Sequence, residues 1–156
     1  DTVKFLAGAD YRNIRFTYRE YPELGPTVAN IFMECEFVSG ATAHLNFCPN
    51  TGVVIERATV TLLDHVFMLN APIWAAYDTP GRLLHLHRGE TVADISGDSI
   101  CDADKMYINS GFYGENAAFL DDLLAGRPPV GDIASGLQSV EIADCIRRRL
   151  PEYEME

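Results

Sequence analysis

The sequence predicts an α+β fold, a two-layer domain in which an open-faced, largely antiparallel or mixed sheet of about six strands is backed by C-terminal helices. Three observations carry this prediction. Between residues 14 and 87, apolar and polar residues alternate in short segments, which is the period of half-buried strands. The turns between these segments are too short for the crossovers that parallel strands need, so neighbouring strands pair as hairpins. A helical period replaces the alternation only after residue 110.

A short helix is expected to precede the strands. Leu6 lies just before Gly8, and a glycine after the last apolar residue is a typical helix stop. Ile14, Phe16 and Tyr18 then alternate with polar residues and predict the first strand. Further strands are expected, in order, over residues 29–37, 41–48, 53–62, 66–69, 73–77 and 82–87.

The connections between these strands contain recognisable turn sequences. Ser39–Gly40 predicts a two-residue hairpin between the second and third strands. Leu63–Asp64–His65 is expected to be another turn, and Asp78–Thr79–Pro80–Gly81 is a strong turn sequence before the last strand. Residues 89–106 are polar and irregular, and no element is assigned to them.

Two helices are expected at the C-terminal end. Ser110 is placed to cap the first, and Gly126 with the prolines after it ends that helix. Its apolar stripe consists of Phe112, Phe119, Leu120, Leu123 and Leu124. Asp132 is placed to cap the second helix, and Pro151 ends it. The predicted packing side of the second helix consists of Ile133, Leu137, Val140, Ala143 and Ile146.

The composition is that of a single globular domain. The 156 residues are 47% hydrophobic and 22% charged, and the formal net charge is −11. This charge opposes nucleic-acid backbones and anionic lipid, so neither a nucleic acid nor a membrane is an expected partner. The basic run Arg147–Arg149 instead complements the dipole at the end of the last helix.

The cysteines favour a reducing compartment. Cys35, Cys48, Cys101 and Cys145 are widely spaced and contain no Cys-x-x-Cys pair, which favours free thiols. The sequence also shows no signal peptide and no apolar run of spanning length. We therefore expect a cytoplasmic protein.

One face of the predicted sheet has mixed polarity. Val28, Phe32 and Val38 fall on the same side as Asn30 and Glu34. Apolar residues scattered over an open sheet face are common at partner surfaces, so we expect a homodimer through this face. A solvated face with incidental apolar residues is the alternative.

Several segments together resemble a known family. Phe112 and Glu115 at the start of a helix are followed by Phe119, Gly126 with prolines, and Asp132. The strand Glu56–Arg57–Ala58–Thr59–Val60 and the opening Asp1–Thr–Val–Lys–Phe–Leu–Ala–Gly8 fit the same pattern. In this order the segments resemble the C-terminal domain of the Gfo/Idh/MocA family of NAD(P)-dependent oxidoreductases.

The resemblance implies that substrate binding and cofactor binding belong to different domains of a longer enzyme. Residues 1–156 would be a single C-terminal substrate-binding and oligomerisation domain, and a preceding Rossmann domain would bind NAD or NADP. The sequence contains no Gly-x-Gly-x-x-Gly, so no cofactor-binding residue is assigned. The implied reaction transfers hydride between NAD(P) and a sugar, cyclitol or related polyol. No catalytic residue is assigned to this chain, which we expect to be inactive alone.

Five residues are candidates for contacts with the polyol substrate. His44 and Asn46 project from the polar side of a strand that we expect to be central in the sheet, close to the break where family members place substrate contacts. Asn50 and Thr51 lie in that break, and loops at strand ends often hold ligands. Tyr113 can reach a cleft from the first turn of its helix, although an aromatic residue there more often packs in a core.

His85 and His87 are the candidates for a metal site. Their i, i+2 spacing places both imidazoles on one strand face. No third ligand is evident, because Asp94 and Asp98 fall in the unassigned segment. A surface or interface pair is the simpler interpretation, and we expect no metal.

Two other classes of protein stay open. The chain can be a non-catalytic binding or assembly module that keeps the fold without the chemistry. It can also be an unrelated curved-sheet ligand-binding domain, although no strand face carries the continuous aromatic lining of a closed pocket. A glycine-rich loop and a Glu-Lys-Pro lysine upstream of residue 1 would decide for the enzyme.

Overall fold

The strands form two separate antiparallel sheets. The computed structural model describes all residues except 74–76, 102–104, 130 and 156. In the described part, eight strands make two four-stranded sheets alongside four α-helices, and this confirms the predicted α+β class. The sequence predicted about six strands in one sheet. The chain divides into two compact units, Asp1–Thr51 with Val130–Glu156 and Gly52–Pro129, and each contains one sheet.

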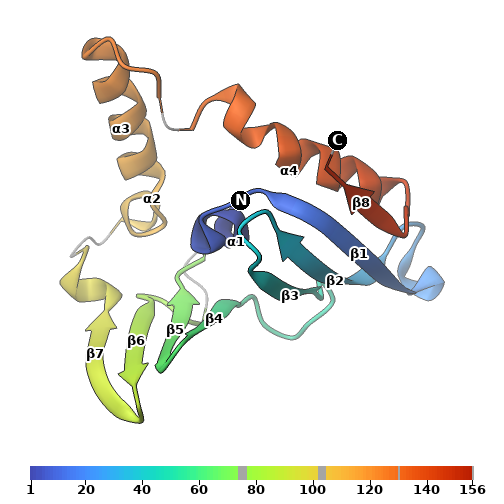
Figure 1. Ribbon diagram of the computed structural model, residues 1–156, viewed down its shortest axis with the longest axis horizontal. Helices are drawn as coiled ribbons and strands as arrows, with labels where there is room; N and C mark the ends of the chain where they lie inside the picture. Colours follow the sequence, from blue (N-terminus) through green and yellow to red (C-terminus); the bar gives the residue numbers. More distant parts are fainter. Residues whose placement is uncertain (74–76, 102–104, 130, 156) are drawn as a thin grey trace. The chain divides into compact units, whose positions relative to one another are not determined.

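The first unit contains the sheet β3-β2-β1-β8 (Figure 1). Its strands are β1 (Tyr11–Glu20), β2 (Ala29–Phe37), β3 (Thr42–Phe47) and β8 (Glu152–Glu154), with a short 3-10 turn at Pro22–Leu24. The alternating segments of the sequence predicted the first three strands. Strand β8 was not predicted, and it pairs with residues 13–15 of β1.

Two helices back one face of this sheet. Helix α1 (Thr2–Ala7) ends at Gly8, whose φ of 62° is left-handed, as the sequence predicted. Helix α4 (Ile133–Arg147) packs on the same core. The buried core consists of Tyr11, Ile14, Phe16, Met33, Cys35, Phe37, Ile142 and Tyr153. Burying one large apolar side chain contributes about 1.5–3 kcal/mol, so this cluster is the main source of stability in the first unit.

The packing side predicted for α4 was largely wrong. Ile133, Leu137 and Val140 are exposed, at 94%, 56% and 66%. The helix instead buries Gln138 and Ile142 and partly buries Cys145 and Ile146, of which only Ile146 was predicted. The reason is a polar anchor, because α4 is oriented by the hydrogen bonds of Gln138 rather than by its most apolar stripe.

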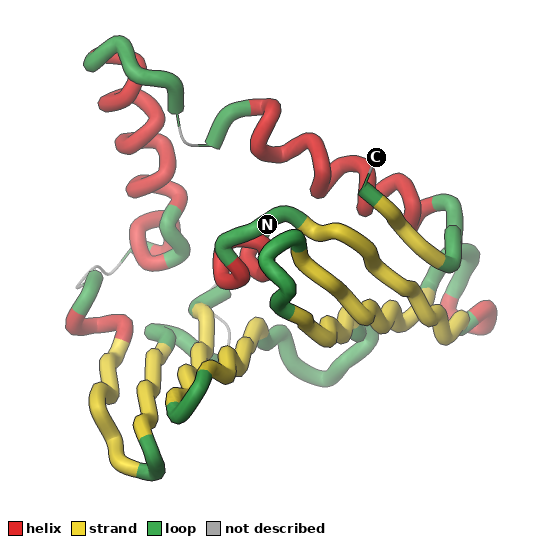
Figure 2. Tube along the Cα trace, in the orientation of Figure 1, coloured by secondary structure: helices red, strands yellow, loops and turns green. Residues whose placement is uncertain are grey.

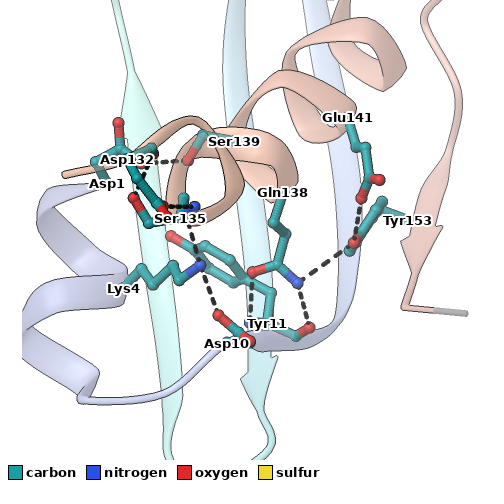
Figure 3. A network of polar contacts seen from close by, with 10 residues as sticks. All are labelled: Asp1, Lys4, Asp10, Tyr11, Asp132, Ser135, Gln138, Ser139, Glu141 and Tyr153. Atoms are coloured by element: carbon teal, nitrogen blue, oxygen red, sulfur yellow. Dashed lines mark hydrogen bonds and ion pairs between the residues drawn. The ribbon is translucent and has the colours of Figure 1, made fainter. Parts of the chain in front are cut away.

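Gln138 joins α4 to the edge of the sheet (Figure 3). Its side-chain oxygen accepts a hydrogen bond from the Tyr11 N–H at 3.0 Å, and its nitrogen donates to the Tyr11 carbonyl at 2.9 Å. The same nitrogen donates to the Tyr153 hydroxyl at 3.3 Å, which in turn donates to Glu141 at 3.0 Å. Since β8 reaches only residues 13–15, the side chain of Gln138 supplies the partner that the Tyr11 backbone would otherwise lack.

Polar contacts also fix the beginning of α4 against α1 (Figure 3). The Asp132 carboxylate accepts a hydrogen bond from the Ser135 N–H at 2.8 Å, which confirms the predicted cap. Lys4 forms an ion pair with Asp10 at 2.6 Å and donates to the Ser135 carbonyl at 3.3 Å. The helix that begins at Asp132 is therefore tied to the segment that leads into β1.

The hairpin between β2 and β3 differs from the predicted two-residue turn. Phe37 N–H donates to the Ala41 carbonyl, and Gly40 N–H donates to the Phe37 carbonyl, so the loop contains three residues, 38–40. Gly40 has a φ of 86°, the left-handed conformation that such loops need. A two-residue loop would have shifted the register by one residue and placed Cys35 opposite His44, which mixes the core and solvent faces.

The second unit contains the sheet β4-β5-β6-β7, drawn as one set of adjacent strands in Figure 2. Its strands are β4 (Glu56–Leu62), β5 (His65–Ala71), β6 (Arg82–His87) and β7 (Glu90–Ser96). Strand β7 lies in the segment to which the sequence assigned no element. The strand predicted over 73–77 falls mostly on residues 74–76, outside the described residues.

The helices of the second unit are α2 (Met106–Asn109) and α3 (Phe112–Leu124). The predicted cap at Ser110 was wrong, because the residue before α3 is Gly111 with a φ of 84° and no side-chain cap. The predicted apolar stripe is exposed in all its members, Phe112, Phe119, Leu120, Leu123 and Leu124. None of the described helices is long and apolar enough to cross a membrane.

A close backbone approach follows β7. Gly97 begins a 3-10 turn, Gly97–Ser99, and its N–H donates to the Gly81 carbonyl at 3.0 Å. A Cβ atom at residue 97 would stand 1.8 Å from the Pro80 carbonyl oxygen, which is far inside van der Waals contact. Only glycine fits at this point of the second unit.

Candidate functional site

Two of the predicted substrate residues lie on the open face of the first sheet. His44 and Asn46 are exposed on β3, whereas Ala43 and Leu45, which alternate with them, are partly buried against the core. The alternation of a strand therefore points both polar side chains away from the helices. The two residues share the polar side of the strand as predicted, but β3 is an edge strand of its sheet and not the central strand that the sequence predicted.

The strand register places two residues of the predicted dimer face, which were not among the predicted substrate residues, beside His44 and Asn46. Glu34 on β2 is the direct partner of His44, and Phe32 is the direct partner of Asn46. Directly opposed side chains in an antiparallel pair have Cβ atoms about 4.5–5.5 Å apart, so each pair can contact one ligand. We define the open-face patch as His44, Asn46, Glu34, Phe32 and Arg15.

Charges alternate along one row of this face. Glu152, Arg15, Glu34 and His44 follow one another across β8, β1, β2 and β3. Among the described residues, neither Arg15 nor Glu34 forms an ion pair, so both remain available to a ligand or to a partner. The row therefore offers hydrogen-bond donors and acceptors in turn.

Asn50 and Thr51 lie in the loop that follows β3, and both are exposed. They belong to the same compact unit as His44 and Asn46. Tyr113 lies in the first turn of α3, in the other unit, and is 61% exposed. The predicted substrate residues that lie in one unit are therefore His44, Asn46, Asn50 and Thr51.

The shifted pKa values belong to structural groups. Burial raises the pKa of Tyr11 to about 12 and that of Cys35 to about 11, and both groups lie in the core. On the second unit, two hydrogen bonds from the Arg57 guanidinium hold the pKa of Asp78 below its usual range. These groups contribute to packing and surface pairing.

The similarity of this chain to known proteins lies in its fold. Neither known protein families nor curated protein sequences give a match to this chain. The fold is similar to that of an aldose-aldose oxidoreductase from Caulobacter crescentus, whose crystal structure was determined as a complex with glycerol. The TM-score is 0.70 at 15% sequence identity, and the similarity covers 98% of this chain and 44% of that chain.

This similarity defines the class of fold. The α+β arrangement of the chain is one that occurs within an oxidoreductase. The chain spans less than half the length of that enzyme, and at this identity the likeness extends to the fold alone.

Proposed function

We propose that the chain is the substrate-binding and dimerisation part of a Gfo/Idh/MocA-like oxidoreductase. The enzyme would transfer hydride between NAD or NADP and a sugar, a cyclitol or a related polyol. The observation that carries this proposal is the fold similarity to an aldose-aldose oxidoreductase over 98% of the chain. Cofactor binding and hydride transfer would belong to a part of the enzyme that this chain does not contain.

The open-face patch has the functional groups that polyol recognition needs. An imidazole, an amide, a carboxylate and a guanidinium can donate to and accept from vicinal hydroxyls. Phe32 is 36% exposed beside Asn46, and an aromatic ring can pack against the C–H face of a sugar. Asn50 and Thr51 extend the polar surface past the end of β3.

The same face supports the proposed dimer. In a two-fold dimer each patch meets its own copy, so a row that contains both Arg15 and Glu34 can pair with itself. Phe32 would then provide apolar area at the centre. A dimer through this face would cover the open-face patch, so self-association and polyol binding at the patch would compete. In the dimer the substrate contacts would be left to Asn50 and Thr51, which lie past the end of β3.

The binding half of the proposal is tested on the isolated chain. We expect NMR titration with glucose, myo-inositol and glycerol to shift resonances of residues 44–51, and His44→Ala and Asn50→Ala to weaken binding. Thr61→Ala on β4 is the control and should change nothing. NADH and NADPH should not bind to the isolated chain. Clear micromolar binding of either cofactor would refute the proposal that the cofactor is bound outside this chain.

The dimer is tested by a charge swap. Glu34→Arg and Arg15→Glu should each weaken self-association in sedimentation equilibrium, because like charges then face each other. The double variant should restore it. Thr59→Arg on β4 provides a charge control. A strict monomer at high concentration of the unmodified chain would exclude the dimer.

A further inference from the structure

Three of the four histidines in the chain lie together on one sheet face of the second unit. His65 begins β5, and His85 and His87 lie on β6. His65 is the direct cross-strand partner of His87, while His85 is two residues further along the same face. The fourth histidine, His44, belongs to the other unit.

The rings of these three histidines, here the histidine trio, are close. The Nδ1 atom of His65 lies 2.9 Å from Nε2 of His85. The ring centroids of His65 and His87 are 4.3 Å apart, and those of His65 and His85 are 5.1 Å apart. All three side chains are partly buried, so they are held by neighbours yet reachable from solvent.

The surroundings of the trio combine an apolar wall with acidic groups. The Phe67 ring stacks on His85 with centroids 4.1 Å apart. Glu90 on β7 is the cross-strand partner of His87 and places a carboxylate beside the trio. The neighbouring cation, Arg88, is paired with Asp64 at 2.8 Å, so its charge is compensated.

The trio does not surround a common point in its present conformation. In the described part of the chain, no three such side chains are already arranged to hold a metal ion. Tetrahedral coordination with bonds of about 2.0–2.1 Å separates two nitrogen ligands by roughly 3.3 Å. The 2.9 Å between Nδ1 of His65 and Nε2 of His85 is a hydrogen bond between the two rings, which an ion bound by both would replace. The stacked rings would have to rotate about their side-chain torsions before their nitrogens converge on one ion.

We propose that the histidine trio binds a divalent transition metal ion, with Zn²⁺ as the matching species. Neutral imidazole is a preferred ligand of Zn²⁺, and three protein ligands leave a fourth position for water or for the Glu90 carboxylate. His65, absent from the sequence-based candidate pair, is the third ligand that the pair lacked. Since the ligands come from β5 and β6, the metal clamps these two strands together.

The first experiment uses the unmodified chain. Zn²⁺ is titrated while the imidazole resonances are followed by NMR, and calorimetry gives the stoichiometry. We expect saturable binding of one ion that shifts the signals of three histidines and leaves His44 unchanged. Binding without those shifts would assign the ion to the thiols and overturn the proposal, as would the absence of binding at millimolar Zn²⁺.

Variants then test each ligand. His65→Ala, His85→Ala and His87→Ala should each weaken Zn²⁺ binding by at least about tenfold, the loss typical even of residues that only support a ligand. His44→Ala is the matched control and should bind as the unmodified chain does. At the same Zn²⁺ concentration, the thermal unfolding midpoint should rise more for the unmodified chain and for His44→Ala than for the three ligand variants. Equal binding by His85→Ala and the unmodified chain would overturn the proposal. The result does not depend on the proposed oxidoreductase function.

Discussion

Replacing Gln138 with leucine should destabilise the first unit more than any exposed substitution in α4. The side chain is 9% exposed and forms hydrogen bonds with both the N–H and the carbonyl of Tyr11. Gln138→Leu preserves most of the volume and leaves both backbone groups without a partner in the interior. Helix α4 would lose the contact that decides which of its sides faces the sheet.

The magnitude follows from the two orphaned groups. Each buried backbone group left without a hydrogen bond costs about 1–3 kcal/mol. Burial of the additional apolar surface of leucine offsets this loss of stability by on the order of 1 kcal/mol. With two such groups and this offset, we expect the free energy of unfolding to fall by about 1–5 kcal/mol.

Urea unfolding followed by circular dichroism measures this loss, and hydrogen exchange of the Tyr11 amide gives a local readout. The exchange rate of that amide should rise, because Gln138 is its acceptor. Leu137→Ala, one residue earlier and 56% exposed, is the control and should change the free energy of unfolding by less than about 0.5 kcal/mol. A loss below about 1 kcal/mol for Gln138→Leu, or an unchanged amide, would refute the reasoning.

Three further predictions concern other parts of the chain. Gly97→Ala should lower the free energy of unfolding by about 1–3 kcal/mol or more, because its Cβ would overlap a carbonyl oxygen. Gly114→Ala, inside α3 with open space around it, should instead stabilise by up to about 1 kcal/mol, and thermal unfolding compares the two. Burial raises the pKa of Cys35 to about 11 and of Tyr11 to about 12, so the native state retains protons that the unfolded chain loses at lower pH. Stability should therefore fall as the pH rises from about 9 toward 12, and Cys35→Ala should flatten the lower part of that curve in urea titrations. Asp132→Ala should cost about 1 kcal/mol in urea unfolding, because α4 loses its cap, and an unchanged midpoint would contradict that role.

The sequence predicted those elements whose own residues carry a strong signal. Strands β1 to β3 alternate clearly because one face of each meets the core. Strand β8 has a single apolar residue, Tyr153, between two glutamates, and so short a segment has no period to detect. Strand β7 was missed because its inward residues, Ala93 and Ile95, are separated by an acid and follow an exposed valine.

The candidate sites depended on register, which the sequence specified only in part. The core-facing residues of β2 and of β3 can lie on the same side of the sheet only if the loop between the strands has an odd number of residues. The observed loop of three residues places Glu34 opposite His44. The pairing of His65 with His87 had no such signal, because the connection from β5 to β6 contains more than a hairpin turn. The helix side of α4 was unpredictable for another reason: hydropathy favours Ile133 and Leu137, whereas a hydrogen-bonding glutamine decides the orientation.

The two units differ in how their stability arises, and this difference bears on the histidine trio. Among the described residues, every buried apolar side chain of the core belongs to the first unit, where α1 and α4 cover the sheet. The second sheet is paired by antiparallel ladders, with one register shift between β6 and β7, but the apolar side chains on its strands are at most partly buried. Backbone pairing alone contributes little net free energy, since the unfolded chain hydrogen-bonds to water. A metal ion held across β5 and β6 would therefore add stability in the unit where burial supplies least, and its effect on unfolding should be largest for that sheet.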